Sequence, residues 1–237
     1  EVRAALAAEG IGVEGLRATA GAATGTALIV VDAEGRNQIA VAPGANRVLA
    51  PADVDAHDGD FAWAQVVVVS LEVPLPTARR ALERARAHGR ATILNPAPLP
   101  DGGLDFLDLA DHVTPNETEA ARLTGVPLAG LADAPRVAAA VRARGATHAI
   151  LTLGAAGAFS AGPAGAAMTA GFAVSAVDTT GAGDAFNGAL AVALAEHRII
   201  AEALRFANAT AALACTRRGA QPSLPTRAEV DRLLRAR

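Results

Sequence analysis

Val66-Val67-Val68-Val69-Ser70 opens the stretch that decides the fold, and Ala91-Thr92-Ile93-Leu94 closes it. Both runs are short, apolar and contain β-branched residues, which is typical of buried strands. Between them, residues 77–88 have the periodic pattern of an amphipathic helix, and Gly89 marks its end. The stretch therefore predicts a strand, a helix and a second strand, the unit from which parallel sheets are built.

The same alternation continues toward the carboxyl end. Further segments with these patterns are strands at 112–114 and 149–153 and helices at 116–124, 133–144 and 185–196. This order predicts an α/β domain of three layers, in which helices cover both faces of a parallel sheet. We expect one such domain over residues 1–237, because no linker is long enough to divide the chain.

Residues 24–46 depart from this pattern. Thr26 to Val31 and Asn37 to Val41 have the composition of strands, and Asp32-Ala33-Glu34-Gly35 between them is a turn signal. These residues predict an antiparallel hairpin attached to the main sheet as a small flap.

Composition narrows the class of protein. The 237 residues carry a net charge of −3 and contain no apolar run long enough for a membrane helix, so we expect neither a nucleic acid nor a membrane as partner. The single cysteine, Cys215, forms no internal disulfide and fits a cytoplasmic protein.

The absence of lysine from the sequence excludes two classes of enzyme, one that binds nucleotides and one that acts on carbonyl groups. All 21 basic residues are arginine, and both a Walker-type phosphate loop and a Schiff-base enzyme need a lysine. A dinucleotide-binding dehydrogenase is disfavoured as well. No Gly-x-Gly-x-x-Gly follows an early strand with an acidic residue about 20 positions on.

The stretch richest in chemistry is Val177-Asp178-Thr179-Thr180-Gly181-Ala182-Gly183-Asp184-Ala185-Phe186-Asn187-Gly188. Its glycines let backbone amides converge at the start of the predicted helix, where the helix dipole favours an anion. The carboxylate of Asp184 at this position can cap the helix or take part in chemistry, and the local pattern leaves both readings open.

The whole string resembles the second signature of the ribokinase-like carbohydrate kinases, Asp-Thr-x-Gly-Ala-Gly-Asp followed by a helix. The resemblance covers nearly all of the chain and implies ATP-dependent phosphorylation of a sugar, with D-ribose giving ribose 5-phosphate. It implies that Gly181, Ala182 and Gly183 form an anion hole for the transferring phosphate. It also implies that Asp184 accepts the proton of the attacking sugar hydroxyl, the general-base role that phosphoryl transfer allows.

The family's Asn-x-x-Glu motif matches Thr114-Pro115-Asn116-Glu117-Thr118-Glu119-Ala120. The resemblance implies that Asn116 and Glu119 help to hold Mg²⁺ and its waters near the phosphates. The two residues are three apart and share a helix face, and the same pair also fits an ordinary capping box.

The resemblance places further nucleotide contacts in Thr152-Leu153-Gly154-Ala155-Ala156-Gly157. Thr152, Gly154 and Gly157 follow a predicted strand, and ligands bind at the carboxyl ends of parallel strands. Asn208 matches a position near the adenine. The glycines can equally be turn residues, and Asn208 can be a solvated residue on a helix.

The tail Arg217-Arg218-Gly219-Ala220-Gln221-Pro222-Ser223-Leu224-Pro225 resembles the family's loop around a monovalent cation such as K⁺. The matching positions would supply oxygen ligands, which suit a hard cation. Without the resemblance, the segment is simply a surface turn rich in Gly and Pro. The implied cation residues are Asp178, Thr180, Ala214, Gly219 and Ser223.

On the sugar side, the resemblance implies that Glu72 contacts the substrate beside Asp184 and that the hairpin closes over it as a lid. In the family such a lid often pairs between two subunits, so we expect a homodimer. The family's first signature, with its Gly-Gly motif, and its early sugar-binding aspartate are absent here. We therefore expect a longer natural protein and little kinase activity from these 237 residues alone.

Two alternatives stay open. The first is a kinase for another substrate, namely fructose, a nucleoside or 2-keto-3-deoxygluconate. The second is a non-catalytic protein of the same fold that binds a nucleotide or sugar. The presence of Asp184 speaks against it, because binding alone does not require a base at this position.

Overall fold

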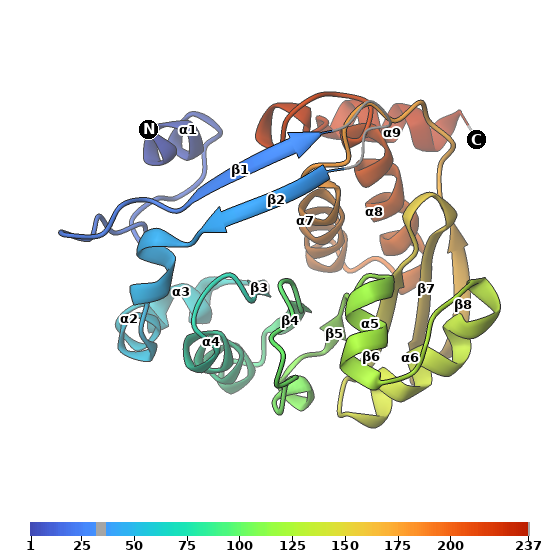
Figure 1. The fold of residues 1–237 in the computed structure, drawn as a ribbon, viewed down its shortest axis with the longest axis horizontal. Helices are drawn as coiled ribbons and strands as arrows, with labels where there is room; N and C mark the ends of the chain where they lie inside the picture. The colour runs from blue at the N-terminus through green and yellow to red at the C-terminus, as the bar shows by residue number, and fades with distance from the viewer. Residues whose placement is uncertain (32–36, 237) are drawn as a thin grey trace.

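The predicted strand–helix–strand unit is present as β3 (Val66–Ser70), α4 (Leu75–Ala87) and β4 (Ala91–Asn95), with the two strands parallel. The structure is a computed structural model, which describes residues 1–31 and 37–236 (Figure 1). Helix α4 begins two residues earlier than predicted, because a proline in the first turn, here Pro76, is compatible with a helix start. Its buried residues Ala78, Leu82 and Ala85 follow helical spacing, so one face packs on the core.

The main sheet has six described strands in the order β3-β4-β5-β6-β7-β8. The parallel part was predicted and ends with β5 (His112–Val113) and β6 (His148–Thr152). The last two strands, β7 (Gly157–Gly162) and β8 (Gly165–Ala170), are antiparallel and were not predicted. Only two residues separate β7 from β8, and so short a connection allows an antiparallel pair alone.

Helices cover both faces of the sheet, as the three-layer prediction requires (Figure 1). One face carries α4, α5 (Glu117–Thr124) and α6 (Ala134–Ala143). The other carries α7 (Ala182–Ala195), α8 (Ile200–Ala214) and α9 (Arg227–Arg235).

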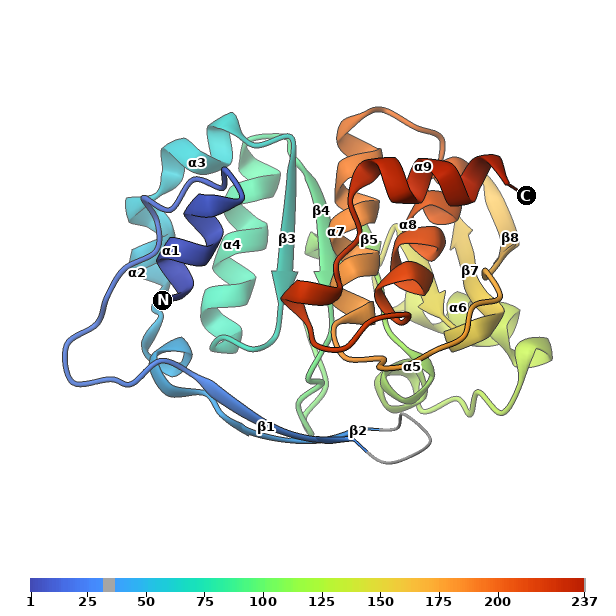
Figure 2. The same cartoon turned by 90° about the horizontal axis from the view of Figure 1, so that it is seen from above.

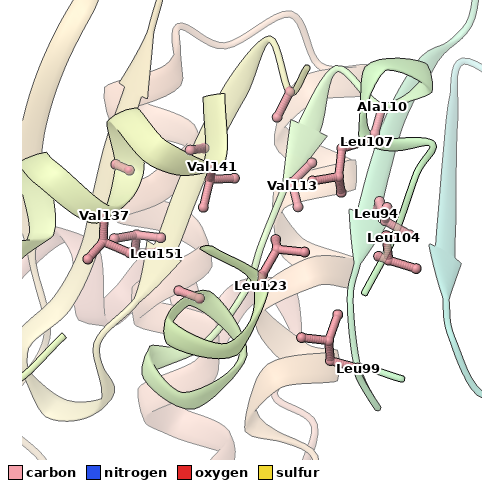
Figure 3. Close-up of a cluster of buried hydrophobic side chains, with 14 of the residues drawn as sticks. Leu94, Leu99, Leu104, Leu107, Ala110, Val113, Leu123, Val137, Val141 and Leu151 are labelled. Carbon is pink, nitrogen blue, oxygen red and sulfur yellow. The ribbon is translucent and has the colours of Figure 1, made fainter. Parts of the chain in front are cut away.

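Two hydrophobic clusters separate these layers. The larger one lies beneath α4, α5 and α6, and Figure 3 shows Val113, Leu123, Val141 and Leu151 meeting there between strands and helices. The second lies between the sheet and α7, α8 and α9. Both faces of the central strands are therefore buried, which explains their continuous apolar runs in the sequence.

The predicted hairpin is also present, as β1 (Thr26–Val31) paired with β2 (Asn37–Ala42). The turn predicted at Asp32-Ala33-Glu34-Gly35 lies outside the described residues. The hairpin forms a separate two-stranded sheet on the side where β3 and β4 end (Figure 2).

The amino-terminal part also contains the short α-helices α1 (Val2–Ala8), α2 (Pro51–Ala56) and α3 (Asp58–Trp63) and a 3-10 helix at Gly44–Val48. None of the helices in the described ranges combines the length and apolar character that a membrane crossing requires.

Candidate active site

A cavity of about 860 Å³ lies where β6 ends and α7 begins. Its walls come from the start of α5, the turn after β6, the segment after β8, the first turn of α7 and one face of α8. The volume is in the range of pockets that bind small molecules and cofactors. The lining includes all five residues predicted to contact a nucleotide: Asn116, Thr152, Gly154, Gly157 and Asn208.

The glycine turn forms the amino end of α7. Gly181 is the N-cap in the left-handed region, with φ of 77°, and α7 starts at Ala182, three residues earlier than predicted. The amide of Ala182 donates to the Thr179 carbonyl at 3.2 Å, whereas the amides of Gly183 and Asp184 have no acceptor in the described chain. The turn therefore presents two unpaired amides at a helix amino end, the usual setting for anion binding.

Asp184 stands in the first turn of α7 next to Gly183, which lines the cavity. The residue as a whole is exposed, and its carboxylate makes no hydrogen bond or ion pair with the described residues, so it is not a cap. Partial burial nevertheless raises the pKa of this carboxyl. An unpaired carboxylate with a raised pKa beside an anion-binding turn is suited to accept a proton.

Two of the predicted cation residues, Thr180 and Gly219, are hydrogen-bonded to a third, Asp178, which is only 7% exposed. Asp178 Oδ1 accepts the amide of Thr180 and Oδ2 accepts the amide of Gly219, both at 2.9 Å. These bonds, led by that of Gly219, hold the pKa of Asp178 below its usual range. Ala214 and Ser223 are fully buried, and Ser223 donates to the Ala220 carbonyl at 2.7 Å.

Asn116 and Glu119 form the capping box of α5. The Glu119 amide donates to Asn116 Oδ1, while Glu119 Oε1 accepts Asn116 Nδ2 and Glu119 Oε2 accepts the Asn116 amide, all at 2.9 Å. Burial raises the pKa of Glu119, and the bonds from Asn116 oppose that rise. The capping alternative is thus realised, and the Mg²⁺ role of the pair remains a prediction.

The backbone conformation and close packing after β6 require glycine at two positions. Gly157 has φ of 107°, and a Cβ there would overlap the carbonyl of Thr169 and the amide of Gly171. A Cβ on Gly171 would overlap the carbonyl of Ala155. The start of β7 and the segment after β8 therefore approach too closely for a side chain at either glycine. Asn208 secures the same corner by donating Nδ2 to the Thr169 carbonyl at 3.0 Å and to that of Ala170 at 3.2 Å.

Glu72 is not part of the cavity. It lies two residues beyond β3, is exposed, and has no side-chain partner in the described chain. It does share the carboxyl edge of the sheet with the residues above, because it follows a parallel strand.

Sequence reasoning missed several residues of the lining. Glu117 lies next to the recognised Asn116, and Thr179 lies inside the quoted glycine-rich string. Phe172 and Val174 follow the unpredicted strand β8. The turn Gly162-Pro163-Ala164-Gly165 was the available signal for that hairpin.

Comparison with known proteins supports these assignments of fold and class. The sequence pattern of the pfkB family carbohydrate kinases matches residues 1–227. The chain is similar to the ribokinase of Haemophilus influenzae, with 38% identity over 225 residues that cover 95% of this chain and 74% of that protein. It is also similar to the deoxyribokinase of Salmonella typhi, with 33% identity over 204 residues, 86% of this chain and 67% of that protein.

A solved structure shares the fold. The Arabidopsis thaliana ribokinase complexed with ribose and ATP is 30% identical, with a TM-score of 0.82 over 95% of this chain and 73% of that one. Fold, cavity and family match agree, and the chain therefore belongs to the pfkB family of carbohydrate kinases and is a sugar kinase.

Proposed function

We propose that the protein transfers the γ-phosphate of ATP to D-ribose, giving ribose 5-phosphate, with Asp184 as the general base. The observation that carries this proposal is the placement of Asp184. Its unpaired carboxylate lies on the first turn of α7, beside the free amides of that turn and next to the cavity.

The step needs little covalent chemistry from the protein. The sugar hydroxyl attacks the γ-phosphorus, the bond to the bridging oxygen breaks, and the hydroxyl proton passes to Asp184. The amides of Gly183 and Asp184, aided by the dipole of α7, stabilise the charge on the transferring phosphate. The raised pKa of Asp184 makes its carboxylate a better proton acceptor.

ATP occupies the 860 Å³ cavity in this proposal. The phosphates lie toward Gly183 and Asn116, and the adenine lies toward Asn208, between the turn after β6 and α8. Support comes from the lining itself, which joins all five predicted nucleotide residues in one hollow.

Two cations fit the donor atoms of the site. The oxygen atoms of Asp178, Thr180, Ala214, Gly219 and Ser223 suit K⁺, a hard cation. Both oxygens of Glu119 already accept bonds from Asn116, which fits an indirect role toward Mg²⁺ through water. When bound, Mg²⁺ would neutralise phosphate charge, and K⁺ would add positive charge near Thr180 and the anion-binding turn that follows it.

Glu72 and Asp184 contact the sugar in this proposal, and the β1–β2 hairpin is the lid. D-Ribose is favoured because the chain is 38% identical to a protein named ribokinase. 2-Deoxyribose is a second candidate, favoured by 33% identity to a protein named deoxyribokinase. The exposed apolar residues of the hairpin, Leu28, Val30 and Val41, support pairing of two lids in a homodimer.

The experiment is a coupled assay of ATP turnover with D-ribose and 2-deoxyribose, with and without K⁺, for the longer natural protein that the sequence predicts and for its Asp184→Asn variant. We expect turnover on ribose that rises with K⁺ and falls by about 10²-fold to 10⁴-fold in the variant, while ATP binding is kept. Turnover on deoxyribose alone would change the substrate and keep the base. ATP binding without turnover on either sugar would contradict the proposal.

A further inference from the structure

Asn187 is a polar residue buried where α7 packs on the sheet. It is 5% exposed and lies among apolar neighbours on the same helix, including Phe186 and Leu190. Burying an amide without partners is unfavourable, so its hydrogen bonds need an account.

The side chain of Asn187 joins the amino end of α7 to the end of β5. Its Nδ2 donates to the Gly183 carbonyl at 2.9 Å, and its Oδ1 accepts the Thr114 hydroxyl at 2.7 Å. A carbonyl only accepts, so the amide nitrogen must face Gly183 and the amide oxygen must face Thr114. The orientation of the amide is therefore fixed by its two partners.

Thr114 continues the connection on the sheet side. It is 1% exposed, and its carbonyl accepts Asn95 Nδ2 at 3.1 Å at the carboxyl end of β4. Its hydroxyl also lies 3.5 Å from the Leu94 carbonyl, so the 2.7 Å bond to Asn187 is the closer of the two. Two residues further along the chain, Asn116 caps α5 and lines the cavity.

These bonds tie Gly183, on the anion-binding turn, to the strand end that leads to Asn116. Buried polar networks with every member bonded specify one arrangement of the elements they join. A hydrocarbon side chain at 187 would fill the space, but it would leave the first turn of α7 without a fixed bond to the sheet.

We propose that Asn187 and Thr114 are positioning residues for phosphate transfer, which hold the amides of Gly183 and Asp184 and the Asp184 carboxylate at the right place relative to Asn116. This inference rests on the proposed function. Neither residue lines the cavity, so each acts through Gly183 rather than on a ligand.

The test compares two replacements of Thr114. Thr114→Val keeps the shape and removes the hydroxyl, whereas Thr114→Ser keeps the hydroxyl and removes a methyl group. We expect Thr114→Val to lower kcat by about 10-fold to 100-fold with little change in KM, the effect of a misplaced catalytic group. Thr114→Ser should keep kcat and lose only thermal stability. The reverse order, with Ser impaired and Val active, would mean that Thr114 acts by packing and would overturn the inference.

Thr92→Val is the matched control. Thr92 is also 1% exposed and hydroxyl-bonded, to Asp111 Oδ2 at 3.0 Å, but it lies near the amino end of β4. Its replacement should lower stability and leave kcat unchanged. An equal loss of kcat in Thr92→Val would show a general effect of destabilisation, against the inference.

A second readout does not need turnover. Amide hydrogen exchange at residues 185–187, the first amides of α7 that donate to carbonyls of its amino-terminal turn, should be faster in Thr114→Val and in Asn187→Leu. In the double variant it should be no faster than in the quicker single variant. Unchanged exchange at these amides would overturn the inference, whether or not the wild type phosphorylates a sugar. Failure to find a sugar substrate would by itself count against the proposed function only.

Discussion

The amide of Gly219 donates to Asp178 Oδ2 at 2.9 Å, across 41 residues of chain. Since Oδ1 of the same carboxylate accepts the amide of Thr180, one side chain joins the segment before α7 to the loop after α8. Arg217 in that loop pairs with Glu229 of α9, so the loop is held from both sides. The predicted cation site is thus an ordered part of the fold.

Asp178→Asn tests this joint. An asparagine offers one acceptor oxygen where the carboxylate offers two, so one buried amide loses its partner. We expect a loss of roughly 1–3 kcal/mol in the free energy of unfolding, measured with urea, and a higher K⁺ concentration for half-maximal activity. The exposed Asp101→Asn is the control, and an equal K⁺ response in both variants would argue against the assigned cation site.

The pH dependence of turnover tests the base. Asp184 must be ionised to accept a proton, and desolvation raises its pKa, so kcat/KM should fall on acidification with a midpoint above that of an ordinary aspartate. The profile should be measured beside thermal unfolding, so that loss of fold is separated from loss of base. The residual activity of Asp184→Asn should not show this acidic fall in kcat/KM. If the fall persists in the variant, the midpoint belongs to another group.

Gly183 and Gly188 provide a matched pair on α7. A Cβ at either glycine meets no atom of the described residues within 4 Å, so we expect both Ala variants to fold and to gain up to about 1 kcal/mol of helix stability. Only Gly183 lines the cavity, where the added methyl group would stand between the helix start and a phosphate. We expect kcat/KM for ATP to fall at least about 10-fold in Gly183→Ala and to stay constant in Gly188→Ala. Equal kinetics in both would remove Gly183 from the phosphate site.

Stability should depend on pH through His112, which stacks on His148 with ring centroids 4.7 Å apart. Burial, followed by the neighbouring His148, lowers the pKa of His112 from 6.5 to about 4. The unfolded chain then binds the proton more readily, so stability is lost as the pH falls from 6.5 toward 4, by on the order of 3 kcal/mol. Unfolding of His112→Leu by urea across this range should show a shallower slope, and an unchanged slope would place the acid sensitivity elsewhere.

We expect the β1–β2 hairpin to form the contact between two subunits. Leu28 and Val30 share one face of β1 and are 71% and 62% exposed. We expect a dimer in sedimentation velocity for the wild type and a monomer for Leu28→Asp, because a charge opposes burial of this face. Leu131→Asp changes another exposed leucine outside the hairpin and should remain a dimer. A monomeric wild type would contradict lid pairing.

Local signals predicted those elements that local chemistry determines. Asn116 and Gly125 mark the ends of α5, and the β-branched run at 66–70 coincides with β3. β7 and β8 were missed because their residues are mostly Ala and Gly, which lack a strand signature.

Only those residues of the candidate site that lie in a sequence motif could be predicted from the sequence. The glycine-rich string and the Asn-x-x-Glu motif pointed to the cavity from two places in the chain. The bond between Thr114 and Asn187 spans 73 residues, and no periodicity in a single sequence reports on a contact between such distant segments. Asn187 therefore stayed without a role until the fold brought the two together.

The close backbone approach at Gly157 and Gly171 sets a limit on redesign of the cavity. A Cβ at Gly157 would overlap backbone atoms of Thr169 and Gly171, and a Cβ at Gly171 would overlap the carbonyl of Ala155. A mutational scan should therefore find both positions intolerant of every replacement. A library intended to change the nucleotide preference should therefore leave this wall fixed. It should instead vary the small side chains that α8 and its end present to the same hollow, which are Ala211, Ala212 and Cys215.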